Sequence, residues 1–295
     1  MPHSLVFDRQ VLRARRKRAV ALGPSTFLLE RVAEDFTDRL AAVLRRFERA
    51  VDLGTPTDAV HRVLAASGKV GSIIAADTST RGGDQAVAAD EEALPFADGS
   101  LDLVVSALAL HLVNDLPGTL IQIRRALRPD GLFLAALLGG DTLTELRQSF
   151  TQAEAEIEGG ASPRVAPFAD LRDLGGLLQR AGFALPVTDV DRVVVRYASP
   201  LALMHDLRRM GATGILADRR RQPLRRATLT RMAEIYRERF ADPDRRIRAT
   251  FEIIWLSGWA PHESQQQPLA PGSAQHRLAD ALGAKEISAG EKAGR

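Results

Sequence analysis

Short apolar runs alternate with stretches of helical periodicity through this 295-residue chain, and this alternation constrains the fold more than any other feature. Strands separated by helices pair in parallel, with helices on both faces of the sheet. The sequence therefore predicts an α/β fold built on a seven-stranded, mostly parallel, doubly wound, Rossmann-like sheet. A helix is expected over residues 116–131. The expected strands are residues 49–54, 70–79, 85–90, 101–108, 131–138, 186–198 and 246–260.

The helical patterns also predict the domain organisation. Residues 1–48 are expected to form an N-terminal helical extension, because apolar residues recur there at steps of three and four between charges. Residues 49–270 are expected to form the main domain, with helical insertions at about 141–165 and 200–241. The small, polar and charged residues 271–295 predict a flexible tail.

Composition excludes several classes of protein. The 40 basic and 37 acidic residues nearly balance, and aromatic residues are only 5% of the chain, so the charged patch and stacking side chains of a nucleic-acid binder are not expected. The lack of cysteine excludes disulfides, thiolate catalysis and cysteine-ligated metals. No apolar run approaches the roughly 20 residues of a membrane span, and no secretory signal is present, so a cytoplasmic protein is predicted. Residues 262–265, HESQ, lack metal-ligand spacing, and no metal site is predicted.

Carboxylates follow three of the first four predicted strands. Asp52 and Gly54 close the first strand, Asp77 closes the second, and Asp90 with Glu91 follows the third. Ligands of open parallel sheets bind beyond the carboxyl ends of the strands, where a carboxylate can accept both hydroxyls of a ribose. The three ends together predict a nucleoside pocket, although each acidic residue taken alone could be an ordinary polar residue at a strand end.

The loop after the first strand narrows the choice of cofactor. A dinucleotide loop uses a second glycine to bring backbone amides to the pyrophosphate, but this loop carries Pro56, which has no N–H. Asp58 stands at the third glycine position and could cap the next helix. The loop therefore favours a nucleoside cofactor without phosphate.

The chain resembles class I S-adenosylmethionine-dependent methyltransferases, above all in ALPFADGSLDLVVSALALHLVNDLPGTLIQIRRALRPDGLFL. It is most similar to bacterial relatives of respiratory complex I assembly factor 5, through segments such as VFDRQVLRARRKRA, LLGGDTLTELRQSF and GWAPHESQQQPLAPGSA. The resemblance implies S-adenosylmethionine as cofactor and a protein substrate, a complex I subunit that is hydroxylated on an arginine. It also implies a pocket formed by Asp52, Gly54, Asp77, Asp90, Glu91 and Ser106, and a strand exit past His111, Asn114 and Asp115.

The sequence is also compatible with two other functions. A small-molecule or malonyl carrier protein O-methyltransferase is one, and a non-catalytic assembly chaperone with a degenerate cofactor loop is another. His111 could be a general base or a packed strand-end histidine. The GGDTLTELR segment could be a lid or a capped helix. The basic cluster Arg13, Arg15, Arg16, Lys17 and Arg18 predicts a solvated helix face, or else contact with an acidic protein or, peripherally, an anionic membrane.

Overall fold

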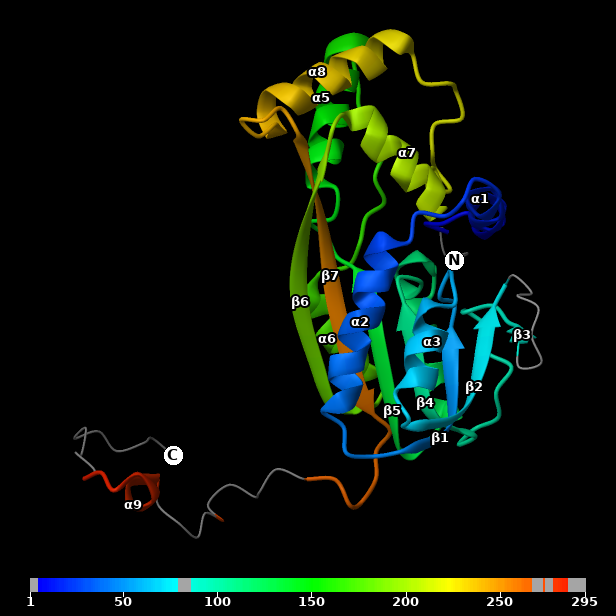
Figure 1. The fold of residues 1–295 in the computed structure, drawn as a ribbon, viewed down its shortest axis with the longest axis vertical. Helices are drawn as coiled ribbons and strands as arrows, with labels where there is room; N and C mark the ends of the chain where they lie inside the picture. Colours follow the sequence, from blue (N-terminus) through cyan, green and yellow to red (C-terminus); the bar gives the residue numbers. More distant parts are fainter. Residues whose placement is uncertain (1–4, 79–85, 267–272, 274–277, 286–295) are drawn as a thin grey trace. The chain divides into compact units, whose positions relative to one another are not determined.

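A computed structural model describes residues 5–78, 86–266, 273 and 278–285 of the chain (Figure 1). The chain divides into two units, residues 1–261 and 262–295. The second contains the short helix α9 (Leu278–Leu282), and much of the tail predicted there lies outside the described residues.

The first unit is built on a seven-stranded sheet in the order β3-β2-β1-β4-β5-β7-β6. Strands β1 to β5 pair in parallel, and β7 pairs antiparallel with both β5 and β6. The predicted mostly parallel, doubly wound sheet is confirmed, and each of the seven expected strands is present. Their bounds are β1 Phe47–Leu53, β2 Val70–Asp77, β3 Ala86–Ala88, β4 Leu101–Ala107, β5 Leu127–Leu138, β6 Ala184–Tyr197 and β7 Ile247–Trp259.

Helices cover both faces of the sheet because consecutive strand residues, which point to opposite faces, are apolar on both. Val105 belongs to the core under the N-terminal helices, whereas its neighbour Val104 belongs to the core on the opposite face. Helix α2 and the following α3 lie in front of the sheet in Figure 1. The helices are α1 Arg9–Ala21, α2 Phe27–Ala41, α3 Ala59–Ala66, α4 Leu116–Ala126, α5 Thr144–Glu158, α6 Leu171–Arg180, α7 Pro200–Met210 and α8 Arg226–Phe240, with a short 3-10 turn at Leu110–Leu112.

The helix expected over residues 116–131 ends earlier than the sequence pattern indicated. It stops at Ala126, and β5 begins at Leu127, which pairs with Leu101 of β4. Pro129 cannot donate a helical hydrogen bond, and Asp130 has a positive φ of 61°, so neither residue continues a helix.

Three helices form a cap at one end of the first unit. Strands β6 and β7 are 14 and 13 residues long and extend past their neighbours toward α5, α7 and α8 (Figure 1). Helix α5 packs against α8. We refer to α5, α7 and α8 as the cap.

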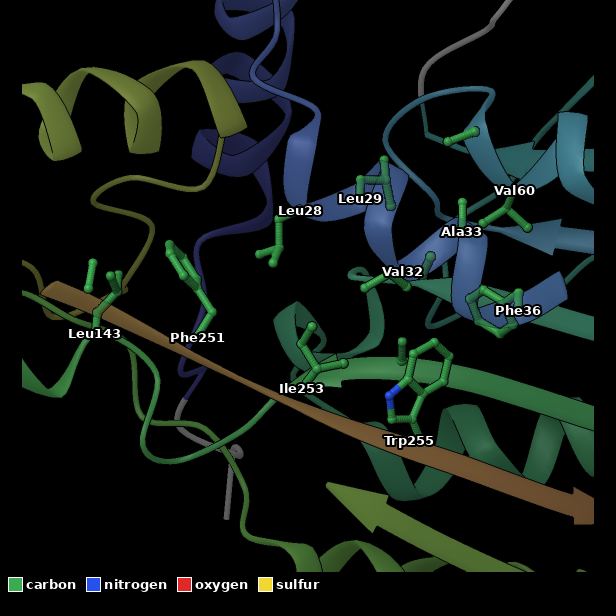
Figure 2. Close-up of a cluster of buried hydrophobic side chains, with 14 of the residues drawn as sticks. Leu28, Leu29, Val32, Ala33, Phe36, Val60, Leu143, Phe251, Ile253 and Trp255 are labelled. Atoms are coloured by element: carbon green, nitrogen blue, oxygen red, sulfur yellow. The ribbon is translucent and has the colours of Figure 1, made fainter. Parts of the chain in front are cut away.

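The core between α2 and the sheet depends on aromatic packing. Phe36 of α2 is completely buried, and its ring meets Trp255 of β7 edge to face with 5.0 Å between ring centroids. Figure 2 shows both rings beside Val32 and Ile253 in this cluster.

Replacing Phe36 by alanine should destabilise the protein by about 3–5 kcal/mol, because the change removes a buried ring and leaves a cavity. Leu44→Ala is the control, since Leu44 is 99% exposed and should change stability little. Denaturant unfolding measures both variants. Equal stability of the two would contradict the role given to this contact.

Candidate functional site

The carboxyl ends of β1, β2 and β3 lie side by side at one edge of the sheet. Leu53 pairs with Ala76, and Asp77 pairs with Ala88. The backbone N–H of Gly54 donates to the Ala76 carbonyl at 2.7 Å. Asp52 and Asp77 are both buried here. The strand ends thus bring together the acidic residues that were expected to form a nucleoside pocket.

Gly54 occupies a position that only glycine can fill. Its φ is +71°, and an added Cβ would lie 2.7 Å from Glu91 Oε1 and 3.0 Å from the Ala109 Cβ. A side chain there would be strained and would also clash. The first glycine of the loop is therefore required by the approach of Glu91 to the backbone.

Glu91 is completely buried and is compensated by two arginines of α1. Its carboxylate forms ion pairs with Arg9 and, at 3.3 Å, with Arg16. Its backbone carbonyl accepts a hydrogen bond from the Thr119 hydroxyl at 3.1 Å. A buried carboxylate without partners would cost several kcal/mol, so this pairing secures α1 to the end of β3.

Asp90, beside Glu91, belongs to the same network. Arg9 contacts it at 2.9 Å and Arg13 at 3.0 Å. Burial disfavours the ionised form of Asp90, but the backbone N–H of Glu92 and the charge of Arg9 outweigh it and hold the pKa of Asp90 below its ordinary value. Asp90 is therefore ionised at neutral pH.

The basic cluster on α1 is not simply a solvated face. Arg13 and Arg16 bind Asp90 and Glu91, and Arg18 donates to the Thr213 hydroxyl at 3.2 Å. Arg9 was missed in the sequence, although its spacing of seven residues from Arg16 places both side chains on one face of a helix. That spacing was the available signal. The acidic partner could not be identified because it lies more than 70 residues away in the sequence.

Two hydroxyls hold the loop after β1 against β4. The Ser106 hydroxyl donates to the Leu53 carbonyl at 2.7 Å, and the Thr55 hydroxyl oxygen accepts from the Ala107 N–H at 3.2 Å. Both side chains are completely buried. Ser106 thus joins two strands, and Thr55 contributes an anchor that the sequence pattern did not reveal.

Asn114 and Asp115, which follow β4, have different structural roles. Asn114 binds the backbone of Phe7 through both amide atoms, at 2.8 and 3.2 Å, and so holds the chain that leads into α1. Asp115 caps α4 by accepting from the Gly118 N–H at 2.8 Å. Asp58, in contrast, makes no capping bond to α3 and pairs with Arg62 instead.

His111 is packed in an apolar environment. Its ring meets Phe168 edge to face at 5.3 Å, and its Nδ1 is buried with no hydrogen-bond partner among the described residues. Burial, reinforced by the positive charge of Arg16, lowers the pKa of His111 to about 3. The imidazole is neutral at neutral pH and is a weak base there, which favours the packed histidine over the general base.

The GGDTLTELR segment is attached to β7. Thr142 exchanges two hydrogen bonds with the backbone of Glu252, at 3.2 and 3.1 Å, and Glu145 accepts from the Thr250 N–H at 3.1 Å. Gly139 is required because an added Cβ would lie 2.3 Å from Glu252 Oε1. These bonds describe a fixed connection at the start of α5 rather than a lid.

Within the part of the chain that the structure describes, no group of three or more His, Asp and Glu side chains is arranged to hold a metal ion. None of the described helices is both long and apolar enough to span a bilayer.

Comparison with known proteins places this geometry in context. A family profile described as a methyltransferase domain matches residues 27–186. The chain is 40% identical to "Arginine-hydroxylase NDUFAF5, mitochondrial" of Danio rerio, over 93% of this chain and 89% of that protein. It is 31% identical to malonyl-acyl-carrier-protein O-methyltransferase of Gallionella capsiferriformans, over 88% of this chain and 93% of that protein. Among solved structures, YcgJ of Bacillus subtilis shares the fold with a TM-score of 0.50 at 16% identity, covering 76% of this chain and 97% of YcgJ.

The low pKa of His111 predicts an acid-sensitive fold. A histidine whose folded pKa lies below its unfolded value of 6.5 contributes stability above pH 6.5 and loses it as the pH falls toward about 3. As the pH falls, the free energy of unfolding of the His111→Gln variant should decrease by up to about 1.4 kcal/mol less per pH unit than that of the wild type. Denaturant unfolding at several pH values in that range measures it, with exposed His205→Gln as the control. Parallel profiles of wild type and His111→Gln would refute the assignment.

Proposed function

Because the chain belongs to the S-adenosylmethionine-dependent methyltransferase family, we propose that it is an enzyme that modifies an arginine side chain of a protein partner, a subunit of respiratory complex I. The observation that carries the proposal is similarity over nearly the full length of both chains to a protein named arginine-hydroxylase. A match confined to the methyltransferase domain would support only the fold. We propose the cytoplasm as the compartment in which the unassembled partner is met.

S-adenosylmethionine is the cofactor of this family, and the acidic side chains gathered at the strand ends support the proposal that it binds there. We assign Asp77 to the ribose hydroxyls, Asp52 to the amino group of the methionine part, and Asp90 to the adenine side. Pro56 does not weaken this proposal, because the cofactor has no phosphate that needs its missing N–H. When bound, the cofactor supplies an electrophilic methyl group on a sulfonium.

The proposed reaction is hydroxylation, following the printed name of the relative. Replacing a C–H hydrogen of the arginine side chain by OH consumes one O₂ and two electrons with two protons, and releases one water. The second oxygen atom leaves in that water, and the electrons come from a soluble two-electron donor. In this reaction the cofactor is retained, and the residues of the pocket hold it beside the substrate.

Methyl transfer to a carrier protein is the second candidate, supported by the match to the malonyl carrier protein methyltransferase over most of both chains. There a substrate carboxylate would take the methyl group, leaving S-adenosylhomocysteine and a methyl ester. The identity of 31% is lower than the 40% found for the arginine-hydroxylase over a similar share of this chain, which favours the first candidate.

Asp77→Asn should weaken S-adenosylmethionine binding by at least about 100-fold, because the amide cannot replace charge-assisted bonds to two hydroxyls. Titration calorimetry measures the affinity. Asp98→Asn is the matched control, since Asp98 is exposed and forms only a surface ion pair with Arg125. Equal affinity of the two variants would remove Asp77 from the cofactor site.

Incubating the protein with isolated complex I subunits should add one oxygen atom to an arginine of one subunit, in the presence of O₂ and a two-electron donor. Peptide mass spectrometry distinguishes this from the gain of a methyl group. Methylation of a carrier protein, with no oxygen added to any subunit, would establish the second candidate instead. Binding of a subunit without S-adenosylmethionine binding would be the behaviour of a chaperone.

A further inference from the structure

Two adjoining cavities are rich in arginine, and one of them includes Arg15 of α1 in its lining. One has a volume of about 610 Å³ and the other about 330 Å³, and both are lined by Arg220 and Arg221. We call the two together the arginine groove. Its arginines are Arg15, Arg164, Arg219, Arg220, Arg221 and Arg225.

The groove is assembled from segments that lie far apart in the sequence. Its lining comes from the segment that follows α5, from α1, and from the segment between α7 and α8, which runs between the cap and α1 in Figure 1. This last segment is joined to the chain before α1 by backbone hydrogen bonds, from Asp8 N–H to the Ile215 carbonyl at 2.7 Å and from Ala217 N–H to the Val6 carbonyl at 2.9 Å. The arginines are therefore held together by the tertiary fold.

Carboxylates of the chain form ion pairs with only half of the groove arginines. Arg219 pairs with Asp8 at 3.0 Å, Arg164 pairs with Glu154, and Arg220 pairs with Glu158. Within the described residues, the other three arginines form no ion pair: Arg15, Arg221 and Arg225. The Nε of Arg15 is buried and has no hydrogen-bond partner there. Glu158 also lines the groove and interacts electrostatically with Arg225 as well as with Arg220. Arg15 and Arg221 are thus the groove arginines without a carboxylate partner in the described residues.

The chemistry of the lining selects carboxylates on a polypeptide. Guanidinium groups bind carboxylates through two parallel hydrogen bonds, and several in a row suit successive acidic side chains. Aromatic side chains, on which single-stranded nucleic acids stack, are absent from the described lining. A membrane-binding face would carry large apolar residues beside its basic ones, and no such residue belongs to the described lining.

We propose that the arginine groove docks an acidic segment of the protein partner. The inference rests on the proposed function for the identity of that partner. Arg15 lines the groove while its neighbour Arg16 contacts Glu91, so α1 joins the docking surface to the cofactor site. An acidic segment bound there leaves the adjoining part of the partner chain beside the pocket.

The probe is a fluorescein-labelled oligo-glutamate peptide, and fluorescence anisotropy at low salt measures its affinity for the full chain. The charge-reversal variant Arg221→Glu with Arg225→Glu should bind the probe at least roughly tenfold more weakly. The matched control is Arg172→Glu with Arg237→Glu, which changes the charge equally at exposed positions outside the groove. Arg221→Gln with Arg225→Gln repeats the test without introducing repulsion, and thermal melting confirms that each variant is folded.

The proposal is overturned if both charge-reversal variants bind the probe equally, or if the wild type does not bind it. Binding only to phosphatidylglycerol vesicles or to inorganic phosphate would also overturn it, in favour of a lipid or anion site. Calorimetry with S-adenosylmethionine separates this result from the proposed function. The groove variants should bind the cofactor normally, while a wild type that does not bind the cofactor would refute the proposed function alone.

Discussion

The structure depends on the compensation of one buried carboxylate. Glu91 fits over Gly54 at the end of the sheet, where it is shielded from water, and such a charge is tolerated only with cationic partners. Arg9 and Arg16 provide them, and both come from α1. Because Glu91 needs these two arginines, the N-terminal helix α1 is held against the strand ends. The need for these partners also explains the positive charge that depresses the pKa of His111 further than burial alone.

Local signals determined most of the fold in advance. Each strand could be predicted because a short apolar run between helical patterns has few other interpretations. The carboxylates Asp52, Asp77 and Asp90 could be predicted as neighbours because parallel strands end at a common edge. The largest error in a predicted strand boundary, at Leu127, follows from a helical periodicity that continued past a proline.

Long-range contacts were beyond the reach of the sequence. An arginine on a polar helix face looks the same whether it meets water or a carboxylate more than 70 residues away. For this reason the cluster on α1 was interpreted as mainly solvated, although Arg13 and Arg16 complete the site. The fixed attachment of Thr142 to β7 was hidden in the same way, because a capping pattern does not reveal which strand its side chains contact.

The length of β6 and β7 ties the cap to the sheet. The two strands continue toward the cap as one hydrogen-bonded ribbon, and α5 is tied to β7 at its start. Bending this ribbon would break a ladder of paired backbone groups. Helix α1, in contrast, is held by ion pairs and by a small apolar cluster around Phe7 and Leu12. Moving α1 away would leave the buried carboxylate of Glu91 without its two cationic partners, so this helix is a fixed part of the protein as well.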